Sequence, residues 1–237
     1  MGTEPSRVNA LCERYRTTHR DLFLPETPAH AVTVRPFSID RSEVTNAAYS
    51  SFVDRHPEWA PGRVPADRQN GDYLKHWARG RFPPGAADLP VTYVTWWAAT
   101  AYCESTGMRL PTEAEWEFAA RGGLASAEFP WGDEAPDPTR ANWAGTNLGA
   151  PTRVGSFPPN PYGLYDMAGN VWEFVQDTWT DRSGASPASA APQDRHVIRG
   201  GSYGASPINL RVRYRDSHPA AGAGPHVGFR CARSAIR

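Results

Sequence analysis

Two histidines near the end of the chain are of a type and spacing that can hold a metal. His218 and His226 lie eight residues apart on the Pro-, Gly- and Ala-rich connection SHPAAGAGPH, and Asp216 and Glu173 are the candidate carboxylate ligands. Two imidazoles with one carboxylate suit a non-haem iron site. A connection of this composition does not fix the geometry of its ends. The alternative is therefore that His226 packs against a groove wall and His218 is exposed.

The segment GNVWEF carries hard oxygen ligands at close spacing. Asn170 and Glu173 are three residues apart, with backbone carbonyl groups between them that are free to turn inward. Ca²⁺ prefers oxygen ligands on a tight loop of this kind. In the alternative interpretation, the two side chains only form hydrogen bonds within the loop, as buried polar groups usually do.

The cysteines form no recognisable ligand set. Cys12, Cys103 and Cys231 are odd in number and widely spread, without metal-type spacing. Cys103 falls within an expected helix and Cys231 within an expected strand, so both are predicted to be core residues. Unpaired cysteines predict a reduced, cytoplasmic setting.

Composition excludes several classes of protein. Lys plus Arg and Asp plus Glu are both 25, so the net charge is zero and the basic excess typical of nucleic-acid binders is missing. The run Arg211, Arg213 and Arg215 alternates like one face of a strand, and we expect ion pairs there. The sequence has no apolar run near 18 residues, which predicts no membrane contact.

The elements that must position these residues are short. Nine Trp, 23 Pro and 21 Gly predict many turns pinned by aromatic side chains. Residues 1–30 are polar and lack an apolar signal core, so we expect a polar leader with a short helix around residues 7–20. Residues 31–237 are predicted to form one compact α+β domain with little regular secondary structure, and the Ser/Ala/Pro-rich stretch 181–194 is predicted to be flexible.

Three helices and several strands have clear signals. Thr95 is expected to cap a helix that runs to Ser105, and Thr112 with Glu115 forms a capping box before a helix that ends at Gly122. A further helix is predicted from Ser42 or Thr45 to about Asp54, after a strand containing Val32, Val34 and Phe37. The last strands are expected in HVIRGGSY, LRVRYRD and HVGFRCAR.

These motifs, in their order, are specific to one family. The segments SEVTNAAYSSFV, PVTYVTWWAATAYCE, RLPTEAEWEFAARGG, FPWGD, NPYGLYDMAGNVWEF, VIRGGSY and HVGFRCAR follow one another over residues 30–234. The set resembles the domain shared by formylglycine-generating enzymes (sulfatase-modifying factors), ergothioneine-type sulfoxide synthases and pyoverdine-maturation proteins. The resemblance implies a single domain similar in fold to C-type lectins.

The resemblance also implies structural calcium. One site would be formed by Gly169, Asn170, Val171 and Glu173, with Gly169 and Val171 acting through backbone oxygens. A second site would match Asn142 and Trp143. Its carboxylate position falls near Thr146, which predicts weak or absent binding there.

The resemblance places a cysteine pair where this chain has none. In formylglycine-generating enzymes two thiolates after the GGS turn bind Cu⁺, and the metal activates O₂, which oxidises a substrate cysteine. The matching positions hold Ala205 and either Leu210 or Arg211. Cysteine-to-formylglycine conversion is therefore not expected. Ser202 keeps the hydroxyl of the turn, whereas the usual Trp and Asn of the groove are replaced by Phe174 and His226.

Two functions follow from these observations. The first is a metal-assisted oxidoreductase or other tailoring enzyme, with Fe²⁺ or Cu⁺, that acts on a peptide or small natural product. Its catalytic candidates are Ser202, Tyr203, Arg213 and His226, and its substrate groove is expected to include Phe174, Ala205, Leu210, Arg211, Asp216 and His218. The second is a non-catalytic, lectin-like module that binds a ligand or peptide. The absence of the cysteine pair favours this second function, whereas the mostly enzymatic character of the family that the sequence resembles favours the first, which we expect.

Overall fold

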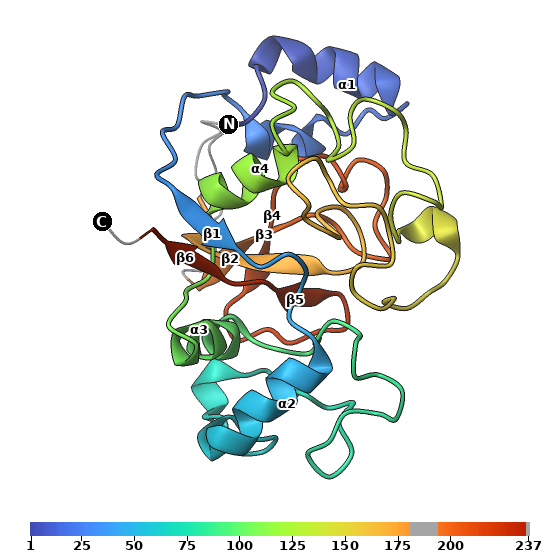
Figure 1. The fold of residues 1–237 in the computed structure, drawn as a ribbon. Coiled ribbons are helices and arrows are strands. Elements are labelled where there is room, and N and C mark those ends of the chain that lie inside the picture. The colour runs from blue at the N-terminus through green and yellow to red at the C-terminus, as the bar shows by residue number, and fades with distance from the viewer. Residues whose placement is uncertain (181–193, 236–237) are drawn as a thin grey trace.

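Two small β-sheets lie across the middle of the protein, with helices on both sides (Figure 1). The structure is a computed structural model that describes residues 1–180 and 194–235. Its helices are α1 (Val8–Arg14), α2 (Asn46–Arg55), α3 (Trp96–Ser105) and α4 (Glu113–Arg121). Short 3₁₀ turns occur at Pro5–Arg7, Arg20–Leu22, Leu24–Glu26, Pro57–Trp59, Ala66–Arg68 and Ala144–Thr146. The predicted α+β class is confirmed.

The larger sheet has the strand order β4-β3-β2-β5. The strand β2 (Trp172–Thr178) pairs in antiparallel orientation with β3 (Arg195–Arg199) and in parallel orientation with β5 (Val227–Phe229). At the edge, β4 (Asp216–Pro219) is antiparallel to β3. The smaller sheet joins β1 (Phe37–Ile39) to β6 (Ala232–Ser234). The expected strand at Val32 and Val34 is wrong in extent, because these two residues lie outside β1.

The central strand β2 separates two apolar cores. Successive side chains of a strand point to opposite faces, so Phe174 packs with α2 and α3 whereas Val175 packs with Trp116 of α4. In Figure 1, α2 and α3 accordingly lie on one side of the sheets, and α1 and α4 lie on the other. Burial on both faces holds β2 and the segments at its ends in fixed positions.

The helix starts follow the predicted capping signals. Thr45, Thr95 and Thr112 each accept a hydrogen bond from the backbone three residues later. Glu115 returns the bond to the Thr112 backbone, which completes the predicted capping box, and Gly122 ends α4 in a left-handed conformation. These predictions are confirmed.

The predicted strand over LRVRYRD is wrong for most of its length, because β4 begins only at Asp216. The residues before it form turns closed by backbone bonds, such as Tyr214 N–H to the Arg211 carbonyl. Arg211 reaches Glu26 and Glu128, and Arg215 reaches Glu113. The expected ion pairs are therefore present for Arg211 and Arg215, whereas Arg213 donates to backbone carbonyls.

The first 30 residues pack against the rest of the protein. Val8, Leu11 and Phe23 form a small apolar cluster. Glu26 is buried and accepts hydrogen bonds of 2.7 and 3.1 Å from Arg211. The segment expected to be a polar leader thus supplies the counter-charge of a buried arginine. Its helix is shorter than predicted, at Val8–Arg14.

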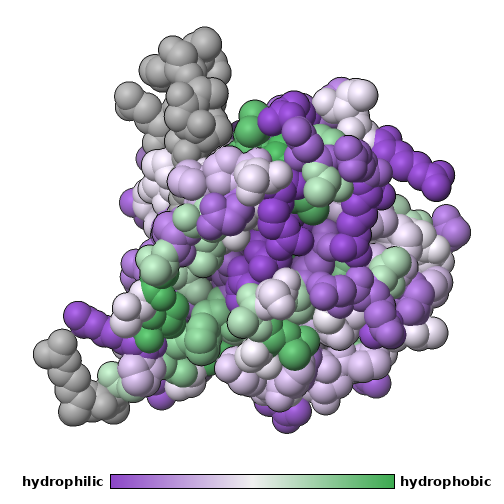
Figure 2. Space-filling view, turned by 90° about the horizontal axis from the view of Figure 1, so that it is seen from above, coloured by the Kyte–Doolittle hydropathy of each residue, from purple (hydrophilic) through white to green (hydrophobic). Residues whose placement is uncertain are grey.

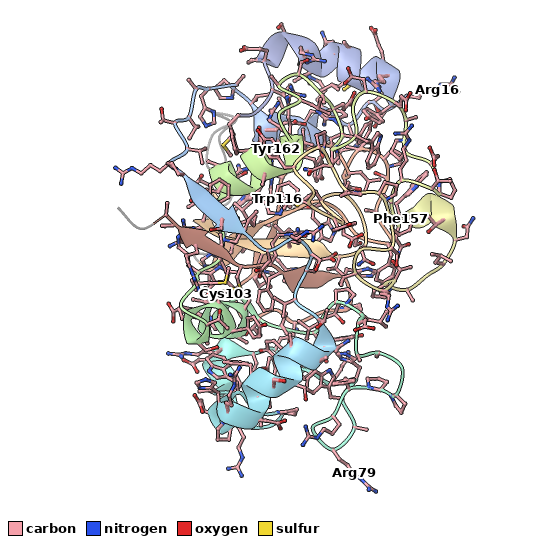
Figure 3. The ribbon with its side chains drawn as sticks, in the orientation of Figure 1. Arg16, Arg79, Cys103, Trp116, Phe157 and Tyr162 are labelled. Atoms are coloured by element: carbon pink, nitrogen blue, oxygen red, sulfur yellow. A yellow bond between two sulfur atoms is a disulfide. The ribbon has the colours of Figure 1, made fainter. Side chains whose placement is uncertain are left out.

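A disulfide joins Cys103 of α3 to Cys231, which follows β5 (Figure 3). Both residues are fully buried, so their prediction as core residues is confirmed. The expectation that they are unpaired is wrong, because the fold brings two positions 128 residues apart into contact. Cys12 is the free cysteine of the described part of the chain.

Within the described ranges, no helix has the length and apolar character needed to cross a membrane. The stretch 181–194, predicted to be flexible, lies outside the described residues except for Asp194.

Candidate functional site

A groove of about 400 Å³ lies beside the turn that follows β3. Four segments contribute to it: the start of β2, the Gly-Gly-Ser turn, the edge strand β4 and the residue before β5. The lining residues are Trp172, Ile198, Ser202, Gly204, Ala205, Asn209, Asp216, Ser217, His218, His226 and Val227. The groove thus collects five of the residues that the sequence predicted for the site.

Ser202 and His226 face each other in this groove. The Ser202 hydroxyl lies 3.5 Å from Nδ1 of His226, and the Tyr203 ring lies 4.5 Å from the imidazole. The position of His226 is fixed because its carbonyl accepts the Trp172 N–H at 2.8 Å. The preceding turn needs glycine, since Gly201 has a φ of 78° and a Cβ there would lie 2.9 Å from Leu210 Cδ2.

Asp216 and His218 lie on the edge strand β4. They are two residues apart and therefore point to the same face of the strand, and both line the groove. His218 is paired across the sheet with His196, and its ring lies 5.7 Å from the buried ring of Phe174. Phe174 itself is fully buried beneath the groove.

Burial shifts the ionisable groups of the groove towards their neutral forms. Burial and the neighbouring Arg195 lower the pKa of His218 to about 4, and burial lowers the pKa of His226. Burial also raises the pKa of Asp216 and that of Tyr203. At neutral pH both imidazoles are therefore uncharged, which is the form that binds metals or accepts protons.

The groove does not present a ready-made metal centre. Asp216, His218 and His226 are ligand types that suit Fe²⁺. However, in residues 1–180 and 194–235 no three His, Cys, Asp or Glu side chains are grouped closely enough to hold an ion. Glu173, the other predicted carboxylate, is engaged elsewhere by Arg230.

A Cu⁺ site of two thiolates does not fit this groove. Ala205 lines the groove, and Leu210 is buried behind it in the same apolar cluster. Cys12, the unpaired cysteine of the described segments, lies instead by the cluster of Val8, Leu11 and Phe23. The positions expected to replace the thiolates are thus occupied by apolar packing.

Five predicted residues do not line the groove: Phe174 is buried beneath it, Tyr203 lies beside His226, and Leu210, Arg211 and Arg213 point elsewhere. Leu210 belongs to the core beneath it, and Arg211 is buried between Glu26 and Glu128. Arg213, predicted to be catalytic, lines a different cavity and donates to the carbonyls of Ser126 and Ala127. The reason is the turn in place of the expected strand, which directs these side chains towards α4 and the N-terminal segment.

The predicted calcium loop is tightly folded. Gly169 has a φ of 82°, and a Cβ there would meet the Asn142 carbonyl oxygen at 2.2 Å. Asn170 is buried and accepts the Thr152 N–H at 2.9 Å. Glu173 accepts hydrogen bonds from Arg230 on both oxygens and a third from the Trp116 indole.

Two carboxylates beside this loop were missed by the sequence analysis. Glu43 and Asp166 are buried near Glu173, and the three carboxylates face one guanidinium, that of Arg230. Burial and mutual repulsion raise the pKa of Glu43, and burial raises that of Asp166. Oε2 of Glu43 has no hydrogen-bond partner. Asp166 could have been found from the sequence, because it lies four residues before Asn170 in the same motif. Glu43 lies 127 residues from Asn170, so no local pattern connects the two.

The second predicted calcium site holds a neutral hydrogen bond. The Thr146 hydroxyl donates to Oδ1 of Asn142 at 3.0 Å. This bond uses the side-chain oxygen that would face a cation. Trp143 packs by its ring with Phe129 and Leu210.

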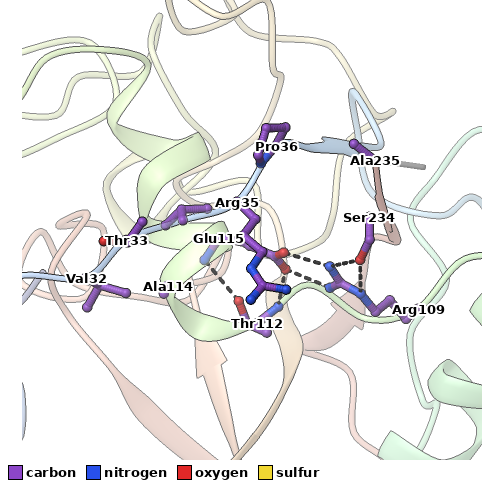
Figure 4. Close-up of a pocket in the computed structure, with 11 residues that line it drawn as sticks. Val32, Thr33, Arg35, Pro36, Arg109, Thr112, Ala114, Glu115, Ser234 and Ala235 are labelled. Atoms are coloured by element: carbon purple, nitrogen blue, oxygen red, sulfur yellow. Dashed lines mark hydrogen bonds and ion pairs between the residues drawn. The ribbon is translucent and has the colours of Figure 1, made fainter. Parts of the chain in front are cut away.

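A second cavity, of about 870 Å³, is separate from this groove. It lies between residues 32–36, the start of α4 and the end of β6 (Figure 4). Its ionisable pair, Arg109 and Glu115, has a structural role. Arg109 donates to both oxygens of Glu115 at 2.7 and 2.6 Å, and Glu115 caps α4. We therefore place the candidate site in the Ser202 groove.

Comparisons with known proteins agree with this fold. "Inactive C-alpha-formylglycine-generating enzyme 2" of Mus musculus is 37% identical over 90% of this chain and 80% of its own length. The "Formylglycine-generating enzyme" of Streptomyces coelicolor is 35% identical over 89% and 82%. The solved structure of PvdO from Pseudomonas aeruginosa is 30% identical, with a TM-score of 0.70 over 89% of this chain and 85% of that one.

The family is settled by the match of one family model. The model of the sulfatase-modifying factor enzyme 1-like domain matches residues 9–235, nearly the whole chain. The structure agrees with it in having one C-type-lectin-like domain built around β2 and the GGS turn. The chain therefore belongs to the sulfatase-modifying factor (formylglycine-generating enzyme) domain family, as a member without the cysteine pair at the GGS turn.

Proposed function

We propose that this protein is a tailoring enzyme, a metal-assisted oxidoreductase, that acts on a peptide or small natural product in the Ser202 groove. One observation carries the proposal: Asp216, His218 and His226 all line the groove that also contains Ser202. Two neutral imidazoles and a carboxylate from other positions would take the metal-binding role that two thiolates have in formylglycine-generating enzymes. Conversion of cysteine to formylglycine is not the proposed reaction.

The residues favour Fe²⁺ over Cu⁺. Asp216, His218 and His226 are the ligand types for the iron, and because the structure does not group them closely enough to hold an ion, binding would have to draw them together. Bound iron would supply oxygen-activating redox chemistry. The residues around them have separate roles. The Ser202 hydroxyl hydrogen-bonds and orients a polar substrate group, and Nδ1–H of an iron-bound His226, 3.5 Å from that hydroxyl, would hold the hydroxyl in place. The Tyr203 ring, tilted against that of His226, restricts rotation of the imidazole.

A metal titration tests the proposal. Fe²⁺ under anaerobic conditions is expected to bind with a stoichiometry of one, and His226→Ala is expected to lower the affinity at least 100-fold. His19→Ala is the matched control, because His19 is exposed and lies in the N-terminal segment. If the wild type binds no Fe²⁺ beyond the calcium-type site, or if His226→Ala binds it as tightly, the metal-assisted reaction is excluded.

We further propose that Ca²⁺ has a structural role beside the GNVWEF loop. Glu43, Asp166 and Glu173 bring three carboxylates to one arginine, so a divalent cation would balance the buried charge. Asp166 and the backbone oxygens of Gly169 and Val171 would join Glu173 as ligands. A chelator is expected to lower Tm by several degrees, and Asp166→Asn to abolish the effect. An unchanged Tm would show that calcium does not stabilise the fold.

A non-catalytic binding module is the second candidate function. It is favoured by the absence of a convergent metal-holding group in the described residues and by the close relative whose printed name begins "Inactive". In this case a peptide or small molecule would bind the groove without oxygen consumption. Substrate-dependent oxygen consumption that His226→Ala abolishes would decide for the enzyme.

The prediction of a cytoplasmic location was based on unpaired cysteines. The Cys103–Cys231 disulfide removes that basis, because structural disulfides are rare in reducing compartments.

A further inference from the structure

Arg213 differs from the other buried arginines of the fold. Arg199, Arg211, Arg215 and Arg230 each form an ion pair with a glutamate. Arg213 is only 9% exposed, yet its hydrogen bonds go to the backbone carbonyls of Ala127 and Ser126, both at 3.2 Å. Among the described residues no carboxylate balances its charge. An unpaired buried charge is costly, so a bound anion would stabilise the protein at this position.

The surroundings of Arg213 add positive charge. Arg121, Arg7 and Arg211 repel its guanidinium, and Glu117, which attracts it, is already paired with Arg121 and Arg199. Burial and the repulsion by Arg121 lower the pKa of Arg213. A guanidinium has five N–H donors, and two of those of Arg213 donate to backbone carbonyls. The remaining donors are available to an acceptor from outside.

Arg213 lines a cavity of about 510 Å³ that has aromatic walls. Phe118 of α4 and Tyr162 also line it, and the two rings are 6.0 Å apart and tilted by 43°. They are 47% and 51% exposed, which is unusual for large apolar side chains. Tyr162 lies against α4 (Figure 3). Apolar residues also gather at one edge of the molecule when it is viewed from above the α1 and α4 layer (Figure 2).

We propose that this cavity is a binding site for an aromatic carboxylate, either a free acid or the C-terminal residue of a peptide. The carboxylate would accept two hydrogen bonds from Arg213, since the planar guanidinium matches a carboxylate in fork geometry. The aromatic ring would pack against Phe118 and Tyr162. The site is distinct from the Ser202 groove, which Arg213 does not line, and does not depend on the function proposed there.

Affinity measurements with 3-phenylpropionate test the site. Calorimetry or NMR titration is expected to show that the neutral 3-phenylpropanamide binds at least tenfold more weakly, because it leaves the guanidinium unpaired. Inorganic phosphate, without a ring, is expected to bind at least tenfold more weakly as well. A short peptide ending in Phe, with a free or an amidated C-terminus, distinguishes the two sources. Tighter binding of the free-terminus peptide than of 3-phenylpropionate would identify a peptide as the ligand.

Variants locate the binding. Arg213→Met keeps the apolar stem and is expected to lose at least tenfold in affinity for 3-phenylpropionate. Tyr162→Ala removes an exposed ring and should not disturb folding. It therefore provides a second test if Arg213→Met does not fold. It is expected to weaken binding three- to tenfold. Leu148→Ala (Leu148 is 55% exposed and does not line the cavity) is the matched control. Equal binding of acid and amide, or unchanged affinity in folded Arg213→Met, would overturn the proposal. His226→Ala is expected to leave the affinity for 3-phenylpropionate unchanged, which would show that this cavity and the Ser202 groove are separate sites.

Discussion

Removing the Cys103–Cys231 disulfide should cost the protein a large part of its stability. The two cysteines are 128 residues apart, so the cross-link restricts a long loop in the unfolded chain. The chain-entropy relation gives about 17 cal/mol/K for such a loop, or about 5 kcal/mol at 25 °C. Native disulfides usually provide about 2–5 kcal/mol. We therefore expect the double variant Cys103→Ser/Cys231→Ser to lose about 3–5 kcal/mol of unfolding free energy.

Urea unfolding of the wild type, with and without reductant, measures this loss. In a domain of this size about 1 kcal/mol corresponds to 2–4 °C, so Tm should fall by roughly 6–20 °C. Cys12→Ser is the control, since Cys12 is unpaired and half-buried, and it should change stability by less than about 1 kcal/mol. A thiol assay in denaturant without reductant should find one free thiol of three. Three free thiols, or a double variant as stable as the wild type, would refute the reasoning.

Three further predictions concern stability. Thr112→Ala should cost about 1 kcal/mol in urea unfolding by removing the capping box of α4, whereas a loss below about 0.3 kcal/mol would show that packing alone fixes the helix start. Glu173→Gln should cost about 1–3 kcal/mol by weakening the two charge-assisted hydrogen bonds to buried Arg230, which keeps Glu43 and Asp166 as neighbouring acids, and a neutral result would contradict the charge assignment. Because the pKa of folded His218 is about 4 and that of an unfolded histidine about 6.5, the unfolded state takes up more protons between these values. Stability should fall by about 2 kcal/mol, allowing for solvent screening, as pH drops from 6.5 to 4. His218→Asn should remove that slope in urea titrations, and an unchanged slope would assign it to other groups.

Local signals were the part of the fold that sequence could predict. Thr95, Thr112 and Glu115 act within one helical turn, and their capping was correctly predicted. The motif order over most of the chain identified the family, and with it the groove around Ser202 and His226.

Contacts across long sequence distances were the part that could not be predicted. Arg211 was assigned to the groove because it is one of two positions that match a cysteine of the family. Its acid partner Glu26 lies 185 residues away and was assigned to a separate leader. Cys103 and Cys231 each fit an apolar environment on their own, and only the fold pairs them. Arg213 was misplaced for the same reason as Arg211, since no local signal reports a turn that is closed by contacts with Glu128 and Ala127.

The pairing of the chain's first and last segments has a consequence for biosynthesis. The strand β1 pairs with β6, and Glu26 pairs with Arg211. A chain leaving the ribosome from its N-terminus must therefore wait for almost the entire domain before either contact can form. Such long-range closure slows folding and exposes apolar surface meanwhile. The apolar side chains of α2 and α3 stay exposed until β2 and β5 have been synthesised, because they pack against these strands. We infer that a chaperone would bind α2 and α3 on the nascent chain.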